Sequence, residues 1–400
     1  MTASSSLARR GLAVLFASSF LELTGYFMLS PLLLLRLKAE GVDTAMAGLF
    51  AAMGWLGIFL ITPFASALTR WLGRRPALWL SAGVPVLASL GFALSYALPV
   101  WFACSAVSGL ASGLRWVLAE SIVAEFSPAE ERGRYVGFFQ TMVGATFIVG
   151  PMLLAGFGAQ NPVSLWWALA FMAAGLAVSL LMPALPRAHD ADDAHVGWRG
   201  VWMALRAHPV IMIAGFSGGY FESGLTAILP LYGLALGLGA AASALLVSAS
   251  GLGSAVMMLP AGLLADRMSR DLRARWGDAH RVRLLLMQVC AALTLAATLL
   301  IPWVAGTPWL AAPVAFVWGG AGGSLYTLCM IDIGSREQGI MLVNSTAVLV
   351  LSYTLGGVLA PITGAMALQW APTLGFPALL LATAAASLAV LLKADRWLRA

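Results

Sequence analysis

Long apolar stretches alternate with short polar connections along almost the whole chain. Each stretch reaches about 20 residues, the length that an α-helix needs to cross a hydrocarbon core about 30 Å thick. Charged residues gather in the connections, as loops between membrane spans require. The pattern predicts twelve transmembrane helices, at about residues 11–35, 43–67, 76–95, 99–124, 135–157, 163–183, 209–233, 241–265, 283–303, 308–330, 340–366 and 373–392.

Two of these spans carry a glutamate in the middle. Glu22 lies about 18 Å along a helix from Arg10, and Glu222 lies about 20 Å beyond Pro209, at roughly 1.5 Å per residue. Pro31 and a second proline, Pro230, follow at nearly equal offsets. An acidic residue at mid-depth, followed by a proline, in matching helices of two halves indicates a transporter built from repeats.

We interpret both glutamates as proton-coupling candidates, because a carboxylate inside a bilayer is costly unless it faces protein or water. Glu22 is the first candidate and Glu222 the second. The alternative is a carboxyl group that is hydrogen-bonded to neighbouring backbone and serves only packing. Tyr26, one turn from Glu22, and Tyr326 are candidates for lining a cavity.

The fourth predicted span carries Arg115, about 24 Å from Pro99 by helical rise, and Glu120. An arginine at this depth must meet a carboxylate, backbone carbonyls or water. A proton-relay or substrate-contact role and a structural ion pair with Glu120 both remain open. Five residues rotate a helix by about 140°, so the second option requires the two side chains to bend together.

Composition places the chain in a membrane. It is 60% hydrophobic and 10% charged, whereas a soluble domain has about 25% charged residues. The formal charge of +6 therefore does not indicate nucleic-acid binding. Cys104, Cys290 and Cys329 each lie alone in an apolar run, so neither a metal nor a cofactor is expected.

Basic residues in the connections predict the orientation. Twenty Lys and Arg fall in alternate connections, and the opposite side has only Arg36 and Lys38. Because basic loops stay in the cytoplasm, both termini are expected there, in a bacterial inner membrane. The bilayer, protons and a small-molecule substrate are the expected partners of a monomer.

The longest polar connection, residues 184–208, is the predicted boundary between two six-helix bundles, 1–183 and 209–400. The fold class is thus an all-α integral membrane protein with twelve transmembrane helices in two pseudo-symmetric six-helix bundles. His189, Asp190, Asp192, Asp193 and His195 in the connection have no closed metal-ligand spacing, which favours a solvated cytoplasmic linker.

Several motifs resemble those of the major facilitator superfamily, and the resemblance covers nearly the whole chain. Residues 262–270 (GLLADRMSR) are similar to its GxLaDRxGRR loop signature, in the second-half copy. The first-half copy is degenerate: Arg74 and Arg75 are kept, but Ser66 replaces the first glycine and Arg70 the aspartate. Residues 137–151 and the LELTGYFMLSP segment of the first span resemble the drug:proton antiporter branch.

This resemblance implies roles for individual residues. Asp266 is expected to face the N-terminus of the fifth span, and Arg267 or Arg270 to pair with Asp332 as a gating latch, with Arg74 and Arg75 as the weaker counterpart. A permanent solvated charge cluster is the alternative to a latch. In the fifth span, Gly144 and Gly150 are expected to allow close helix packing, and Pro151 removes a backbone donor.

Function follows as an expectation: proton-coupled efflux of a small amphipathic or cationic molecule by alternating access. A proton symporter or facilitator for metabolite uptake is the alternative. An intramembrane serine protease is more distant: residues 215–219 (GFSGG) match its motif, but His189, His195, His208 and His280 all fall in connections. We therefore expect no enzyme.

Overall fold

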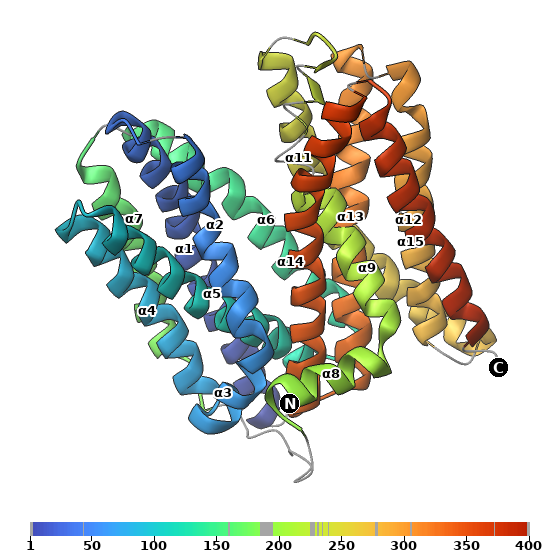
Figure 1. The fold of residues 1–400 in the computed structure, drawn as a ribbon. Helices are drawn as coiled ribbons and strands as arrows, with labels where there is room; N and C mark the ends of the chain where they lie inside the picture. Colours follow the sequence, from blue (N-terminus) through green and yellow to red (C-terminus); the bar gives the residue numbers. More distant parts are fainter. Residues whose placement is uncertain are drawn as a thin grey trace. The chain divides into compact units, whose positions relative to one another are not determined.

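The computed structural model describes residues 3–42, 44–158, 161–184, 195–224, 229, 232–233, 235–238, 240–276, 279–304, 306–371 and 373–397. Within these residues the regular structure is helical, without strands (Figure 1). Eleven of the described helices are long and apolar enough to cross a membrane. The seventh predicted span begins with α9 (Pro209–Gly219) and the π-helix η2 (Tyr220–Gly224), while Pro230 lies outside the described residues.

The chain divides into two compact units. Unit 1 contains Met1–Ser127, Met142–Met203 and Glu337–Ala347, and unit 2 contains Pro128–Thr141, Ala204–Arg336 and Val348–Ala400. Helices α6 (Arg132–Phe157), α8 (Gly197–Ala207) and α14 (Gly339–Trp370) each contribute residues to both. The division at 183 and 209 that the polar connection suggests stays a prediction.

In unit 1, α1 packs against α7, α2 against α5, and α4 against both α5 and α7. The helix bounds are α1 (Ala3–Ala39), α2 (Thr44–Ile61), the 3-10 turn η1 (Thr62–Phe64), α3 (Ala65–Leu72), α4 (Arg74–Leu94), α5 (Leu98–Phe126) and α7 (Val163–Leu180). Glycines permit the crossings: a Cβ on Gly57 would lie 2.6 Å from the backbone nitrogen of Leu110.

Unit 2 repeats this arrangement: α9 packs against α15, α11 against α13, and α12 against both α13 and α15. The bounds are α11 (Ala240–Trp276), α12 (Ala279–Val304), α13 (Pro308–Arg336) and α15 (Gly375–Trp397). The packing pattern is thus the same in both halves: it joins spans 1, 2, 3, 4 and 6 in one half and spans 7, 8, 9, 10 and 12, in the same order, in the other. The all-α fold of two related helical repeats is confirmed.

Part of the predicted linker 184–208 is helical. Residues 185–194, which include His189, Asp190, Asp192 and Asp193, lie outside the described residues. Residues Gly197–Ala207 form α8, a short helix with Arg206 in its last turn. Among the described residues no group of three or more His, Cys, Asp or Glu side chains could hold a metal ion.

Candidate functional site

A buried ion pair lies in the middle of unit 1. Glu22 on α1 is 4% exposed, Arg115 on α5 is 5% exposed, and the Nε of Arg115 pairs with the Oε2 of Glu22. Arg115 also donates to the Oγ of Ser18 at 3.1 Å and to the carbonyl oxygen of Leu78 at 3.4 Å. The pair brings together two residues that the sequence singles out by depth alone.

The proposed pairing of Arg115 with Glu120 is wrong. Five residues turn α5 far enough that Glu120 points elsewhere, and its Oε1 accepts a 2.7 Å hydrogen bond from the indole of Trp116. Glu120 is 2% exposed. The carboxylate of Glu120 thus bonds to a residue of its own helix, whereas Arg115 reaches across to α1.

Small residues allow α1 to carry a glutamate at this point. A Cβ on Gly175 of α7 would lie 2.9 Å from the backbone nitrogen of Glu22, so α7 and α1 make backbone contact there. Tyr26, one turn further along α1, points its hydroxyl toward Gly54 of α2, where a Cβ would lie 3.2 Å away. The close approach of α7 thus fixes the backbone of α1 at Glu22, and the Tyr26 hydroxyl occupies the space beside Gly54.

The helix-packing residues predicted in α6 differ in their surroundings. A Cβ on Gly150 would lie 2.8 Å from the backbone nitrogen of Met28, which shows close approach to α1. Gly144 is half-buried, and Pro151 is exposed within a helix that continues to Phe157.

Glu222 occupies a different environment in unit 2. It lies in η2, the π-helix that continues α9, and is half-buried. The Oγ of Ser254 on α11 donates to its Oε1. Gly323 of α13 leaves room for the carboxyl group, because a Cβ there would lie 3.1 Å from Oε1. A π-helical turn is frequent at functional sites, which makes η2 a second candidate location.

Tyr326 on α13 packs inside unit 2. It is 2% exposed, and its ring meets Tyr353 of α14 edge to face, with centroids 5.0 Å apart. The aromatic pair lies between two helices of the unit, so Tyr326 contributes to helix packing.

Asp266, in the C-terminal third of α11, caps the start of α6. Its Oδ1 accepts from the N–H of Gly133 and its Oδ2 from the N–H of Arg134, both at 2.8 Å. These donors have no partner within the helix, and the helix dipole favours a negative charge there. Glycine at both positions permits the approach, since a Cβ on Gly133 would collide with the carbonyl oxygen of Gly262, and a Cβ on Gly262 with that of Gly133. The contact is the one expected from the sequence, and its gating role stays a prediction.

The expected pairing of Asp332 with Arg267 or Arg270 is wrong. Asp332 on α13 pairs with Nδ1 of His280 at 2.8 Å, with Arg283 at 3.3 Å, and with Arg336. Arg336 is one turn away on the same helix and Arg283 lies on the neighbouring α12, so both are nearer in the packed structure. Arg267 and Arg270 are exposed on α11.

The degenerate first-half motif still forms an ion pair. Arg74 at the start of α4 pairs with Glu125 of α5 at 2.6 Å. The same carboxylate accepts from the N–H of Gly339 at 3.4 Å. Arg75 instead stacks over the ring of Trp79, with 4.4 Å from its guanidinium carbon to the ring centroid. Glu125, at the end of the fourth predicted span, thus anchors one of the nearby loop arginines, an option that the sequence leaves open for Glu120 and Glu125.

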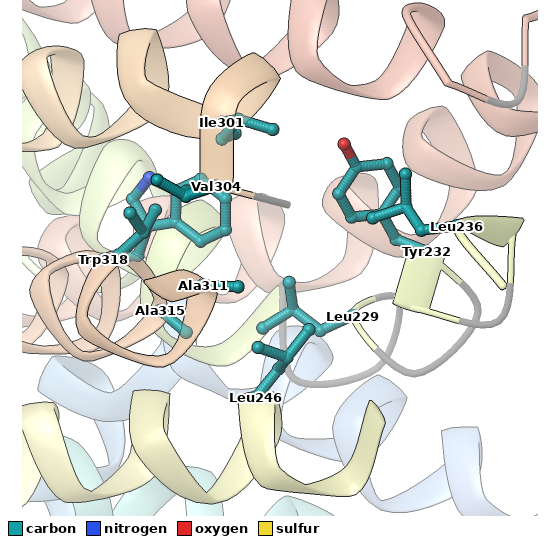
Figure 2. A pocket seen from close by; sticks show the side chains of 10 residues that line it. Leu229, Tyr232, Leu236, Leu246, Ile301, Val304, Ala311, Ala315 and Trp318 are labelled. Atoms are coloured by element: carbon teal, nitrogen blue, oxygen red, sulfur yellow. The ribbon is translucent and has the colours of Figure 1, made fainter. Parts of the chain in front are cut away.

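A small apolar pocket lies elsewhere in unit 2 (Figure 2). Among the described residues, its lining offers a Tyr hydroxyl and a Trp indole as the only polar side-chain groups, and the indole of Trp318 donates to Thr298 at 3.0 Å. The lining consists of Leu229, Tyr232, Leu236, Leu246, Ile301, Val304, Ala311, Val314, Ala315 and Trp318. Because none of these described lining residues carries a charge, they suit an apolar group and not a coupling ion.

Within the described part of the chain, the serine of the protease-like motif is hydrogen-bonded to another hydroxyl and not to a base. Ser217 is 2% exposed and donates to the hydroxyl of Ser387 at 2.6 Å. A serine nucleophile needs an adjacent base, and a second hydroxyl does not serve as one.

Membrane helices in two repeated units, with a buried ion pair in one and a half-buried carboxylate in the other, define a membrane transporter built from repeats. The sequence profile of the Major Facilitator Superfamily matches residues 15–346, and the chain belongs to this family. It is therefore a multi-pass transporter of small molecules and not an enzyme.

Relatives and solved structures agree with this assignment. An uncharacterized MFS-type transporter of Bacillus subtilis, YfkF, is 25% identical, covering 86% of this chain and 84% of its own length. YcaD of Salmonella paratyphi A, also uncharacterized, is 24% identical, covering 86% of this chain and 85% of its own length. In fold the chain is similar to the human organic anion transporter MFSD10, with a TM-score of 0.77 and 18% identity. The match covers 96% of this chain and 99% of MFSD10. The chain is also similar to the transporter FucP in the outward conformation, with a TM-score of 0.70, 17% identity and coverage of 95% and 98%.

Asp266→Asn should slow transport several-fold while the protein stays folded in the membrane. The amide still accepts a hydrogen bond but loses the charge that favours the start of α6, at a cost of about 0.5–2 kcal/mol. Initial rates in vesicles, normalised to the amount of folded protein, measure the effect. Arg74→Ala and Arg75→Ala are the matched changes in the degenerate copy. If they abolish transport and Asp266→Asn does nothing, the relative importance of the two motifs is reversed.

Proposed function

We propose that the protein is a proton-coupled efflux transporter that moves a small amphipathic or cationic molecule by alternating access. The buried ion pair of Glu22 and Arg115 carries the proposal. A proton on Glu22 would remove the charge that compensates Arg115, so Arg115 would have to find another partner. Loading a proton is thereby linked to a rearrangement between α1 and α5.

The efflux direction rests on the similarity of the first and fifth spans to the drug:proton antiporter branch. Glu22 falls on the acidic position of the LDxT…P pattern, and Gly150 with Pro151 on the GP motif. An amphipathic cation suits a protein whose membrane helices are apolar and aromatic and carry glutamates at mid-depth.

Proton symport is the second candidate. Two of the similar solved structures are named as a fucose:proton symporter and a proton:xylose symporter. A buried carboxylate–arginine pair serves either direction of coupling, because protonation has the same local effect in both.

Transport by the purified protein in vesicles with an imposed pH gradient tests the proposal. A panel of amphipathic cations and sugars should reveal a cation that accumulates only while protons flow the opposite way, and a protonophore should abolish accumulation. Accumulation in the direction of proton flow would replace efflux by symport. Transport of a panel member that ignores the gradient would overturn proton coupling.

We also propose that both termini face the cytoplasm of a bacterial inner membrane. This orientation is supported by the distribution of basic residues, because twenty Lys and Arg lie in one set of alternate connections and two in the other. A reporter that works only in the cytoplasm should be active when fused after Ala400. Activity of an export-dependent reporter at the same site would reverse the orientation.

A further inference from the structure

Helix α8 is too short to be a membrane span. Its 11 residues extend about 16 Å. The N–H of Gly197 donates to the Oγ of Ser66 at 2.8 Å, and Nδ2 of Asn344 donates to the carbonyl oxygen of His195 at 2.8 Å. Ser66 lies on α3, which leads directly to Arg74, so the start of α8 is fixed at the arginine-bearing end of unit 1.

One face of α8 is packed and consists of small or aliphatic residues. Gly200, Val201 and Ala204 are buried. A Cβ on Gly200 would lie 2.7 Å from Cγ of Asn344, so only glycine allows this approach. The packing fixes which side of the helix points outward.

The outward face combines aromatic and cationic side chains. Trp198 is 60% exposed, Trp202 45% and Met203 53%, and both Arg199 and Arg206 are exposed. Spacings of three and four residues place these five side chains on one side of the helix. In water this face would leave a large apolar area uncovered next to two positive charges.

We propose that α8 lies in the membrane–water interface and binds the headgroups of anionic phospholipids. Trp is favoured at the interface because its ring is apolar and its N–H is polar. A short helix with Trp on its outer face and arginine beside it binds anionic membrane surfaces. A bilayer of zwitterionic lipid would accommodate the tryptophans. Its headgroups, however, carry no net negative charge to pair with Arg199 and Arg206. The two arginines therefore select the anionic lipid.

Binding can be measured on the purified full-length protein. Native mass spectrometry with added phosphatidylglycerol or phosphatidylcholine would count the lipids retained. Arg199→Gln with Arg206→Gln should weaken phosphatidylglycerol binding about tenfold and leave phosphatidylcholine unchanged. Arg9→Gln with Arg10→Gln removes the same charge from α1 and should have a smaller effect. Equal phosphatidylglycerol binding by the α8 variant and the unmodified protein would overturn the proposal.

Hydrogen exchange supplies a second test. Residues 197–207 should exchange more slowly in phosphatidylglycerol nanodiscs than in phosphatidylcholine nanodiscs. Arg199→Gln with Arg206→Gln should remove the difference, whereas Arg9→Gln with Arg10→Gln should largely keep it. Equal exchange in the two lipids would contradict the proposal. Both readouts measure lipid contact and not transport, so they are independent of proton coupling.

Discussion

Glu22→Gln should abolish proton-driven transport while substrate exchange without a gradient continues. Gln keeps the size and hydrogen-bonding ability of the side chain but cannot titrate. We expect uphill transport to fall at least about a hundredfold, the usual scale for losing a proton-transfer group. Accumulation under an imposed pH gradient and counterflow without one, measured in the same vesicles, separate the two effects.

The same change should also destabilise unit 1. Arg115 would remain buried without a negative charge beside it, with a neutral amide oxygen, the Ser18 hydroxyl and the Leu78 carbonyl as acceptors. Removing one partner of a buried ion pair costs about 3–5 kcal/mol. Adding Arg115→Gln removes the uncompensated charge, so the double variant should recover part of the lost thermal stability and still lack coupling. Recovery of both stability and coupling in the double variant would show that the pair is structural.

Glu222→Gln is the matched comparison, because it is the same chemical change at the half-buried glutamate of unit 2. Its side chain accepts from Ser254, and an amide oxygen can keep that hydrogen bond. We expect a smaller loss of coupling than for Glu22→Gln. If the ranking is opposite, Glu222 carries the proton. If both variants still move substrate uphill with protons, neither does.

Hydropathy alone predicts most of the fold. Eleven described helices match predicted spans, because a bilayer accepts only segments that satisfy their own backbone hydrogen bonds. Helix α8 was missed for a physical reason. Its apolar residues alternate with glycine and arginine within a polar connection, so only the packed face of Gly200 and Val201 reveals it as a helix.

For the site as well, the sequence predicts which residues are important, whereas helix packing determines which of them pair. Depth and rarity identify Glu22 and Arg115, since charge inside a span is costly wherever it points. Their pairing depends on which faces of α1 and α5 meet, and a single sequence does not contain that. The motif placed Arg267 and Arg270 near Asp332, but α12 brings Arg283 and His280 instead.

Asp332→Asn should cause a large loss of stability in unit 2. The carboxylate is 2% exposed and compensates Arg283 and Arg336 together, with His280 as a third partner. Asn keeps the size but leaves two guanidinium groups facing a neutral amide. We expect a cost of about 3–5 kcal/mol, as for other buried pairs that lose one member. Thermal unfolding of the purified protein, followed by size-exclusion chromatography after heating, measures it.

An exposed pair in the same unit provides the control. Glu131 and Arg134 lie 3.7 Å apart with side chains 45% and 63% exposed, and such surface pairs contribute about 0–1 kcal/mol. Glu131→Gln should therefore leave the unfolding temperature nearly unchanged. Arg283→Gln added to Asp332→Asn removes one of the two unpaired charges and should restore part of the stability. If Asp332→Asn and Glu131→Gln behave alike, the cluster around Asp332 is solvated and does not hold α12 against α13.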